Sequence, residues 1–377
     1  MKLKRTVPEI LTAGASGRRG WARMAVAAVA AAAVLRLWIL PMVNSYWLDE
    51  TLIVSIIRDG VGQIVHNAPA TQSIAFCWLE WIVSQLFGLN EVSLRLLSVL
   101  ASLASLYVYY RIGAEFMDQE TGVIFVGLCL ALPQMVHEAP NVRPYSLALW
   151  AEAAALLWLL RWLRSGRYQS GLLWVLCSVA ACHMHHLFVI PLAIESSYVL
   201  YWALRGGPIS VRQTLANLLL GFVALLPAFP QAIAMSRQGA SLAFAEVPKF
   251  TALATTISLF YLLTPVALMA LLAWIAHRPL RWVKLEKGTD VVILGCALLF
   301  VPLFGLFALS RLTSLRLFDE RYLLSAVPGL ILLWGRLLRA VEPPFFRRTS
   351  VALGLMVSLA LPGGLLTVVA LGSSVIP

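Results

Sequence analysis

The sequence predicts an all-α polytopic membrane protein, a bundle of about eleven transmembrane helices with two juxtamembrane helices in the first outer loop. Of its 377 residues, 60% are hydrophobic and only 12% are charged, and the mean hydropathy is +0.83. Such a composition is typical of a chain solvated mainly by lipid. Apolar stretches of about 17 to 25 residues, long enough to cross ~30 Å of hydrocarbon, recur from residue 24 onward and leave no room for a soluble domain.

The charged residues between these stretches predict the orientation of the chain. With the N-terminus inside, 20 of the 29 Lys and Arg residues lie on the inner side and 8 on the outer side, as the positive-inside rule requires. The basic N-terminus resembles a signal sequence, but the many later spans favour an uncleaved anchor. The expected spans are 24–42, 93–112, 121–138, 145–163, 171–184, 187–204, 213–232, 251–276, 289–309, 322–338 and 350–372.

The domain organisation follows from these spans. We expect a cytoplasmic basic N-terminus at 1–23, one transmembrane domain at 24–372 and a short outer tail at 373–377. The first outer loop, 43–92, contains two segments that are apolar but short. Residues 50–58 are followed by Asp59-Gly60, a helix stop. Segment 73–88 would break the charge pattern if it crossed the membrane, so we interpret it as a helix lying on the outer leaflet.

Charge and cysteine content exclude other classes of protein. The formal net charge is +11, but the basic residues fall in short clusters between apolar runs and form no continuous basic face, so nucleic-acid binding is not expected. The five cysteines lie within apolar segments without metal-ligand or disulfide-framework spacing. We interpret them as small buried apolar residues.

The most informative polar feature is the acidic pair Asp49-Glu50, in the string Asn44-Ser-Tyr-Trp-Leu-Asp-Glu-Thr51. Carboxylates at the edge of the membrane are costly, and so they are candidates for a functional site. A structural explanation also exists, because an Asp before a short helix is a good N-cap and a Glu suits its first turn. Both roles are compatible, since a cap would hold Asp49 rigidly. Tyr46 and Trp47 fit the aromatic belt at the headgroup level.

Four short strings, taken in order, resemble the GT-C glycosyltransferases that use polyprenyl-phosphate sugars. The similarity covers most of the chain and is strongest to the bacterial relatives of protein O-mannosyltransferases and to the lipid A aminoarabinose transferases. The strings are Trp47-Leu48-Asp49-Glu50, the run from Leu86-Phe-Gly88 through Ser93-Leu94-Arg95-Leu96-Leu97, Arg143-Pro144-Tyr145, and Glu320-Arg321-Tyr322-Leu323-Leu324 followed by Pro328-Gly329.

This resemblance implies a GT-C-like bundle and an inverting transfer of a hexosyl or pentosyl group to an acceptor hydroxyl. A carboxylate could accept the hydroxyl proton, and guanidinium groups could bind the leaving phosphate. The resemblance implies catalytic roles for Asp49 and Glu50, with Asp49 the preferred base. It implies that Arg143 and Arg321 bind the donor phosphate, with Arg58 and Arg316 in reserve. The residues it implies as cavity lining are Tyr145, His183, His186, Glu138 and Tyr322.

Other interpretations of these residues stay open. Arg143 and Arg321 could instead anchor span ends by reaching headgroups or pairing with a nearby Glu. The histidines of Cys-His-Met-His-His-Leu cannot all point inward from one helix, so we expect a polar helix break and no metal site, although a divalent metal remains possible. Relatives often carry Glu where this chain has Asn141, and prolines near Gln72-Ser73 are missing.

The function expected is glycosyl transfer on the outer, periplasmic face of the cytoplasmic membrane. The expected partners are a polyprenyl-phosphate sugar donor, membrane lipids and a glycan, lipid or protein acceptor. A lipid or glycan transporter or flippase would also use intramembrane acids and broken helices, but no internal repeat is evident. A catalytically degenerate member of the family is the third alternative. Glu152 and Glu195 lie within spans and are expected to face the bundle interior, with Arg36 a possible partner of one of them.

Overall fold

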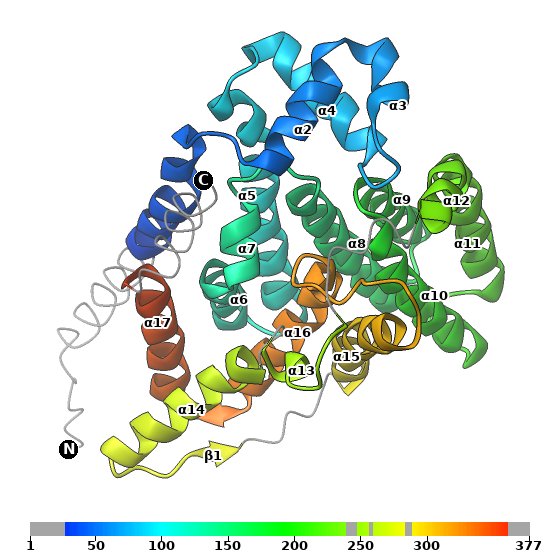
Figure 1. The fold of residues 1–377 in the computed structure, drawn as a ribbon. Helices are drawn as coiled ribbons and strands as arrows, with labels where there is room; N and C mark the ends of the chain where they lie inside the picture. Colours follow the sequence, from blue (N-terminus) through cyan, green and yellow to red (C-terminus); the bar gives the residue numbers. More distant parts are fainter. Residues whose placement is uncertain (1–26, 239–246, 256–258, 283–288, 361–377) are drawn as a thin grey trace, which may run out of the picture.

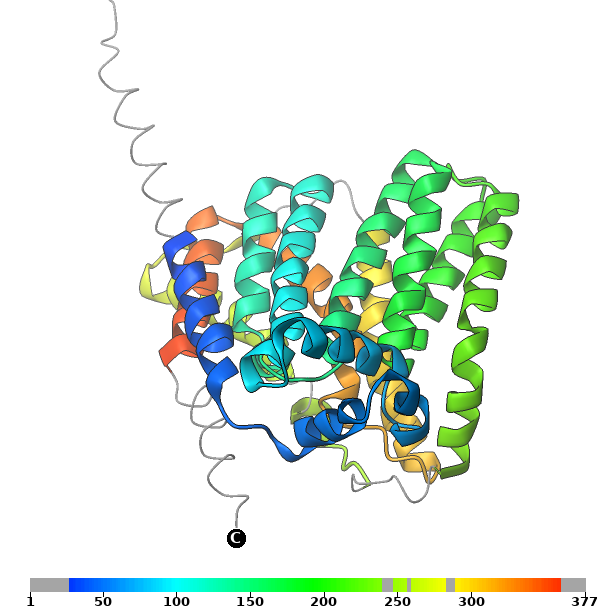
Figure 2. The same ribbon diagram turned by 90° about the horizontal axis from the view of Figure 1, so that it is seen from above.

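The protein is an almost entirely helical bundle with a layer of short helices across one end. A computed structural model describes residues 27–238, 247–255, 259–282 and 289–360. Figure 1 shows short helices α2, α3 and α4 gathered at one end of the longer helices, and Figure 2 shows the same layer in front of them from above. The all-α prediction and the two juxtamembrane helices are confirmed.

The described part of the first helix starts at Ala27 and continues through a π-helical segment, Leu35–Ile39, and a 3₁₀ segment, Leu40–Val43. The other α-helices are α2 Leu48–Arg58, α3 Ile64–Asn67, α4 Ile74–Phe87, α5 Glu91–Phe116, α6 Gln119–Ala131, α7 Pro133–Glu138, α8 Tyr145–Ser165, α9 Tyr168–Met184, α10 Val189–Leu204, α11 Val211–Leu225, α12 Phe229–Gln238, α13 Ala252–Thr255, α14 Leu259–Ile275, α15 Thr289–Leu312, α16 Val327–Arg339 and α17 Pro344–Ala360.

Short 3₁₀ helices join several of these elements. They are η3 Val61–Gln63, η4 His186–Phe188, η5 Leu226–Ala228 and η6 Tyr322–Ala326. The only strands in the described part of the chain are β1 Arg281–Trp282 and β2 Val341–Glu342, paired antiparallel with Arg281 opposite Glu342. The sequence did not predict this strand pair, which is too short to show an alternating pattern.

Each predicted span is helical over most of its described residues, although 121–138 is broken at Leu132, between α6 and α7. Within the described residues, six helices are long and apolar enough to cross a membrane, and Ala27–Val43 and Leu48–Arg58 would add a seventh only as one span bent by 61°. The predicted count of eleven therefore stays a prediction. The ends of the first and last predicted spans, and the segments 1–23 and 373–377, lie outside the described residues.

Segment 73–88 forms α4, whose 14 residues would extend only about 21 Å along a helix axis. That length is short of the ~30 Å hydrocarbon core. Ser73 caps the helix by accepting from the N–H of Phe76 at 3.0 Å, and its hydroxyl donates to the carbonyl of His183 at 2.7 Å. A serine cap thus begins this helix, and the same side chain ties it to the end of α9.

The short helices are held by an apolar cluster of their own. Ile53, Ile56 and Ile57 of α2 have the i, i+3, i+4 spacing of one helix face and are all buried. They pack with Phe76 of α4 and Val142 before α8. Burying one such side chain contributes about 1.5–3 kcal/mol, so this cluster is enough to fix α2 against the bundle.

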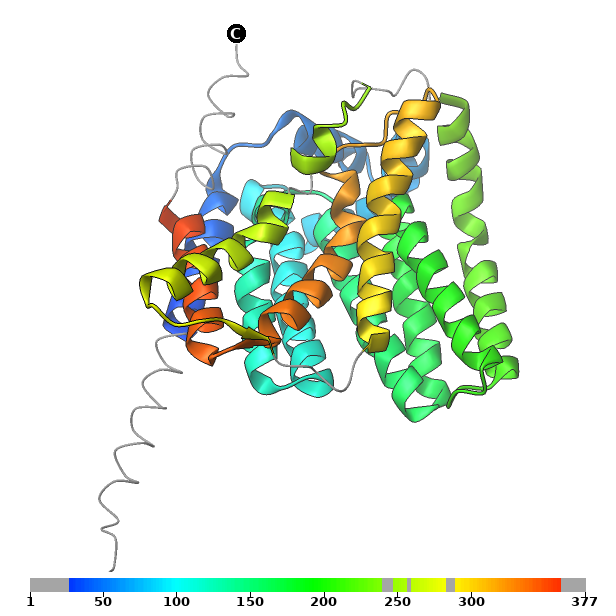
Figure 3. The same ribbon diagram turned by 90° about the horizontal axis from the view of Figure 1, so that it is seen from below.

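The long helices pack mainly with their neighbours in sequence. Helix α8 packs against α9 and α5, α5 against α6, and α15 against α16. The α5–α6 approach needs glycine, because a Cβ on Gly113 would lie 2.6 Å from the backbone of Gly122. Figure 3 shows the resulting bundle, with α17 beside the first helix although they are far apart in sequence.

Two acidic side chains lie in the interior of the bundle, as predicted. Glu152 and Glu195 are fully buried, and Glu195 accepts hydrogen bonds from Trp174 at 2.6 Å and Ser178 at 3.4 Å. Both Glu152 oxygens and Glu195 Oε1 have no hydrogen-bond partner among the described residues. The suggested pairing with Arg36 is wrong, because Arg36 is exposed whereas both carboxyl groups lie inside the bundle.

The orientation of the bundle can be tested by cysteine labelling. In a variant with alanine at the five native cysteines, Leu89→Cys, in an exposed position, should react with an impermeant maleimide added from outside. Ser165→Cys, exposed at the far end of α8, should react only after the membrane is opened. Labelling in the reverse order would overturn the predicted orientation.

Candidate active site

The chain brings Asp49 together with two arginines that are far away in sequence. The guanidinium of Arg143 forms an ion pair with Asp49 Oδ2, and Arg321 Nη1 lies 3.4 Å from the same oxygen. Asp49 is in the first turn of α2, Arg143 is two residues before α8, and Arg321 directly precedes η6. Asp49 and Arg321 are about half exposed, whereas Arg143 is largely buried. The group is therefore assembled by the tertiary fold and is open on one side.

Glu50, next to Asp49, has a different environment. Its side chain is only 1% exposed, and its two oxygens accept from Arg95 Nε at 3.0 Å and Arg95 Nη2 at 2.5 Å. Oε1 also accepts from the N–H of Val142 at 2.8 Å. A carboxylate with these partners is held as a buried, compensated charge, and it fixes α2 to both α5 and the turn before α8.

Helix α2 is capped by Glu50, so the prediction that Asp49 is the N-cap is wrong. The helix begins at Leu48 with Trp47 as its N-cap residue, and the N–H of Trp47 donates to Glu50 Oε2 at 2.9 Å. Asp49 is the second residue of the first turn. Its carboxylate is therefore not used by the helix backbone and is free to face the two arginines.

Arg95 belongs to one of the four strings that resemble the GT-C proteins, but its role was not predicted from the sequence. Besides Glu50, it donates to the backbone carbonyls of residues 41–45, with distances of 3.3 Å to Pro41, 3.0 Å to Met42 and 3.1 Å to Ser45, and a further bond to Asn44. It is 1% exposed. A single guanidinium thus joins the end of the first span, the start of α2 and α5.

The turn that carries Arg143 is held through its backbone. The N–H of Arg143 donates to the carbonyl of Asn141 at 2.8 Å, and Ser98 Oγ donates to the carbonyl of Arg143 at 3.3 Å. The backbone N–H of Asn141 donates to the carbonyl of Glu138 at 3.4 Å. The turn is therefore held to the end of α7. Burial lowers the pKa of Arg143 from its usual value, but arginine stays charged at neutral pH.

Aromatic rings line the side of the group nearest the bundle. The ring of His185 lies 5.0 Å from Tyr145 and 6.0 Å from Tyr322 between ring centroids. Burial, together with His186 and Arg143, lowers the pKa of His185 to about 3. His185 is therefore a neutral imidazole at physiological pH, between two tyrosines that the sequence did predict.

Of the predicted histidines, His183 lies two positions before His185 and His186 lies one position after it. His183 Nε2 is 3.0 Å from the carbonyl of Ala224, which ties the end of α9 to α11. The sequence could not select among three closely spaced histidines, because the helix ends between them and their directions diverge. Within the described residues, no three His, Cys, Asp or Glu side chains are placed to hold a metal ion.

Other predicted residues lie at the edge of the group or away from it. Glu138 is buried and interacts electrostatically with Arg321. The structure does not bring Arg58 to Asp49, because it is exposed at the last turn of α2, about 14 Å along the helix axis. Arg316 donates to the carbonyls of Ser310 at 2.6 Å and Thr313 at 2.5 Å, and so it covers the end of α15.

The helical bundle resembles known GT-C proteins in part of its sequence and in its fold. Residues 71–233 match the family described as dolichyl-phosphate-mannose-protein mannosyltransferase. No curated protein matched the chain.

Two crystal structures share the fold. ArnT from Cupriavidus metallidurans bound to undecaprenyl phosphate is 16% identical, with a TM-score of 0.58 over 91% of this chain and 64% of ArnT. Apo ArnT gives 16% identity and a TM-score of 0.57 over 92% and 65%. The chain therefore spans less than two thirds of the length of ArnT. The predicted resemblance to GT-C proteins is confirmed at the level of the fold.

The buried ion pair can be tested by a double-mutant cycle on the free energy of unfolding. Arg95→Ala leaves the Glu50 charge buried without a partner, which should cost about 3–5 kcal/mol. Arg95→Lys should recover only part of this loss, because an ammonium cannot reach the carbonyls of residues 41–45 and Glu50 together.

The measurement is thermal unfolding of the purified full-length protein in detergent. Arg58→Ala, an exposed arginine on α2, is the matched control and should leave the midpoint unchanged. The assignment fails if Arg95→Ala unfolds like Arg58→Ala, or if Arg95→Ala and Glu50→Gln are additive in the double variant.

Proposed function

We propose that the protein transfers a glycosyl group from a polyprenyl-phosphate sugar to an acceptor hydroxyl on the outer face of the cytoplasmic membrane. The observation that carries this proposal is the pairing of Arg143 and Arg321 with one oxygen of Asp49. A base and two phosphate-binding groups are what such a transfer needs. The match to the mannosyltransferase family and the fold shared with ArnT, which binds undecaprenyl phosphate, support it.

In the proposed reaction the acceptor oxygen attacks the anomeric carbon on the side opposite the phosphate. A new C–O bond forms, the bond from the anomeric carbon to the phosphate oxygen breaks, and polyprenyl phosphate leaves with the electron pair. The acceptor proton passes to the carboxylate of Asp49, a general-base role. The leaving phosphate is stabilised by the guanidinium groups, which can each give two parallel hydrogen bonds.

The ion pairs of the unliganded site give the arginines a second role. While both guanidinium groups bind Asp49, its carboxylate is neutralised and is a poor base. A donor phosphate that binds Arg143 and Arg321 competes for the same N–H groups and releases the carboxylate. The base would then become available only when the donor is present, which disfavours unproductive reaction with water.

The aromatic residues and Glu50 have supporting roles in this proposal. Tyr145 and Tyr322, on either side of the neutral His185 ring, present flat apolar faces and hydroxyl groups suited to a sugar ring. Glu50 is a positioning residue, because both of its oxygens are occupied by Arg95 and backbone N–H groups. Asp49 is therefore preferred over Glu50 as the base.

Substitution at Asp49 tests the base. With purified full-length protein and a panel of polyprenyl-phosphate pentoses and hexoses, release of polyprenyl phosphate should fall by about a hundredfold or more for Asp49→Asn. The unfolding midpoint should stay close to that of the wild type, because Asp49 is half exposed and takes no part in capping. Asp59→Asn, an exposed acid at the other end of α2, is the matched control and should keep the wild-type rate.

The contrasting results are informative. Turnover of Asp49→Asn at the wild-type rate would show that another group is the base. Glu50→Gln should lose activity together with stability, whereas Arg321→Lys should mainly raise the KM for the donor. If the wild-type protein releases no polyprenyl phosphate from any donor, the transferase proposal is wrong and a transporter or a degenerate relative is favoured.

A further inference from the structure

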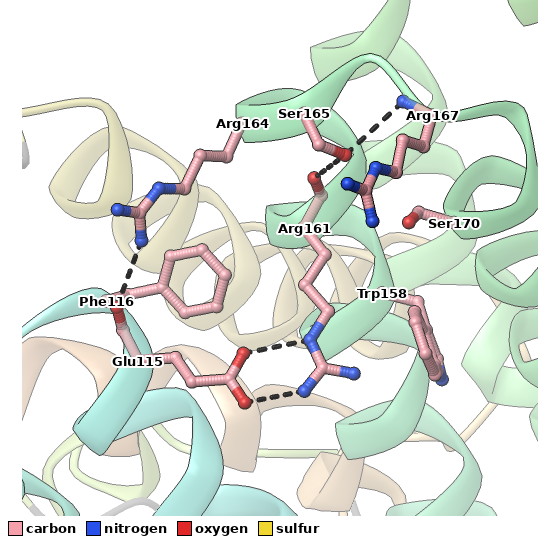
Figure 4. Close-up of a pocket in the computed structure, with 8 residues that line it drawn as sticks. All are labelled: Glu115, Phe116, Trp158, Arg161, Arg164, Ser165, Arg167 and Ser170. Atoms are coloured by element: carbon pink, nitrogen blue, oxygen red, sulfur yellow. Dashed lines mark hydrogen bonds and ion pairs between the residues drawn. The ribbon is translucent and has the colours of Figure 1, made fainter.

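A second polar site lies at the opposite end of the bundle, and the proposed reaction does not use it. A cavity of about 490 Å³ opens between the end of α5, the end of α8 and the start of α9 (Figure 4). Its lining consists of Glu115, Phe116, Trp158, Arg161, Arg164, Ser165, Arg167 and Ser170.

The cavity has more positive than negative charge. Glu115 is its one acidic lining residue, and that carboxylate already accepts from Arg161 at 2.9 and 2.6 Å and pairs with Arg111. Arg164 donates only to the backbone carbonyl of Glu115, at 3.2 Å. In the described part of the chain, no acidic side chain forms an ion pair with Arg164 or Arg167. Two guanidinium groups therefore remain to bind an anion.

The start of α9 adds to this positive field. Arg167 is the N-cap residue of this 17-residue helix, and no side chain accepts from its first N–H groups. The partial positive charge of a helix N-terminus favours an anion nearby. Figure 4 shows the guanidinium group of Arg167 beside Ser170, in the first turn of α9, while that of Arg161 points to Glu115 and that of Arg164 lies on the opposite side, near Phe116.

The length of α8 places the cavity at the second membrane interface. From Arg143, just before α8, to Arg161 is 18 residues along the chain, or about 27 Å along a helix. That distance is close to the ~30 Å hydrocarbon thickness. Tyr107, Tyr168 and Tyr201, 58%, 46% and 50% exposed, are the kind of aromatic residue found at the headgroup level.

An apolar strip leads from the cavity along α8. Trp150, Ala154 and Trp158 are spaced four residues apart and so lie on one face of α8. All three are at least partly exposed, whereas every other residue between 150 and 158 is buried. The Arg161 guanidinium lies 4.5 Å from the centroid of the Trp158 ring. The strip thus joins a basic cavity at the headgroup level to an apolar surface at the depth of the acyl chains.

We propose that this cavity binds the phosphate of an anionic phospholipid, with an acyl chain against Trp150, Ala154 and Trp158. Arg167, at the start of α9, binds the phosphate oxygens, Arg164 adds positive charge from the opposite side of the cavity, and Arg161, held by Glu115, completes the cavity wall. A basic cavity between transmembrane helices at the membrane interface is suited to such a headgroup. The site is independent of the Asp49 group, and it anchors the ends of α5, α8 and α9 to one leaflet.

The test is native mass spectrometry of the purified full-length protein in detergent with equal amounts of phosphatidylglycerol and phosphatidylcholine. The wild type should retain phosphatidylglycerol preferentially. Arg164→Gln/Arg167→Gln should lower that preference by about tenfold, and Arg164→Lys/Arg167→Lys should keep most of it because the charges remain. Arg205→Gln, an exposed arginine next to Tyr201 on α10, is the matched control.

The possible results separate the sources of the anion. Equal retention of phosphatidylglycerol by the wild type and the Gln double variant overturns the proposal. Loss of the lipid preference when millimolar inorganic phosphate is added would identify the cavity as a site for free phosphate and would also overturn it. Arg164 and Arg167 are exposed, so neither double variant should disturb the fold. An unchanged unfolding midpoint in lipid-free detergent would confirm that each variant remains folded.

Discussion

The buried ion pair of Glu50 and Arg95 is the interaction on which the arrangement of the candidate active site depends. Burying two charges is costly unless each remaining donor and acceptor is satisfied, and here they are. The carboxylate accepts from the guanidinium and from two backbone N–H groups, and the guanidinium also donates to the carbonyls of residues 41–45. Four separate parts of the chain therefore meet at one point.

The proposed reactive residues are adjacent to this point in the sequence. Asp49 precedes Glu50, and Arg143 follows Val142, whose N–H donates to Glu50. When the ion pair forms, the base and one phosphate-binding group are positioned together. Only Arg321 is positioned without the ion pair, because it directly precedes η6. Its guanidinium pairs with both Asp49 and Asp319. This division between a rigid pair and a more exposed arginine suits a site that must admit and release a lipid-linked donor.

Helix α8 connects two regions of similar chemistry at its two ends. At the start, arginine, tyrosine and carboxylate groups face the juxtamembrane layer, and at the end, arginines and a tryptophan surround the cavity of Figure 4. Because a charge exposed to hydrocarbon is costly, Arg143 lies just before α8 and Arg161 and Arg164 lie in its last turns, whereas Glu152 between them is buried inside the bundle. In the two proposals, one end acts on a lipid-linked sugar and the other binds a phospholipid of the opposite leaflet.

The sequence by itself determined the helical membrane class, the places of the described helices and the candidate residues Asp49, Arg143, Arg321, Tyr145 and Tyr322. Those inferences depend on hydropathy and on local strings, which are properties of adjacent residues. Only the three-dimensional structure revealed the different environments of Asp49 and Glu50, the contacts of Arg95, the position of His185 beside two tyrosines and the separation of Arg58 from Asp49. These depend on which side chain reaches a partner 45 to 272 residues away, and burial and hydrogen bonding of that kind have no local signature.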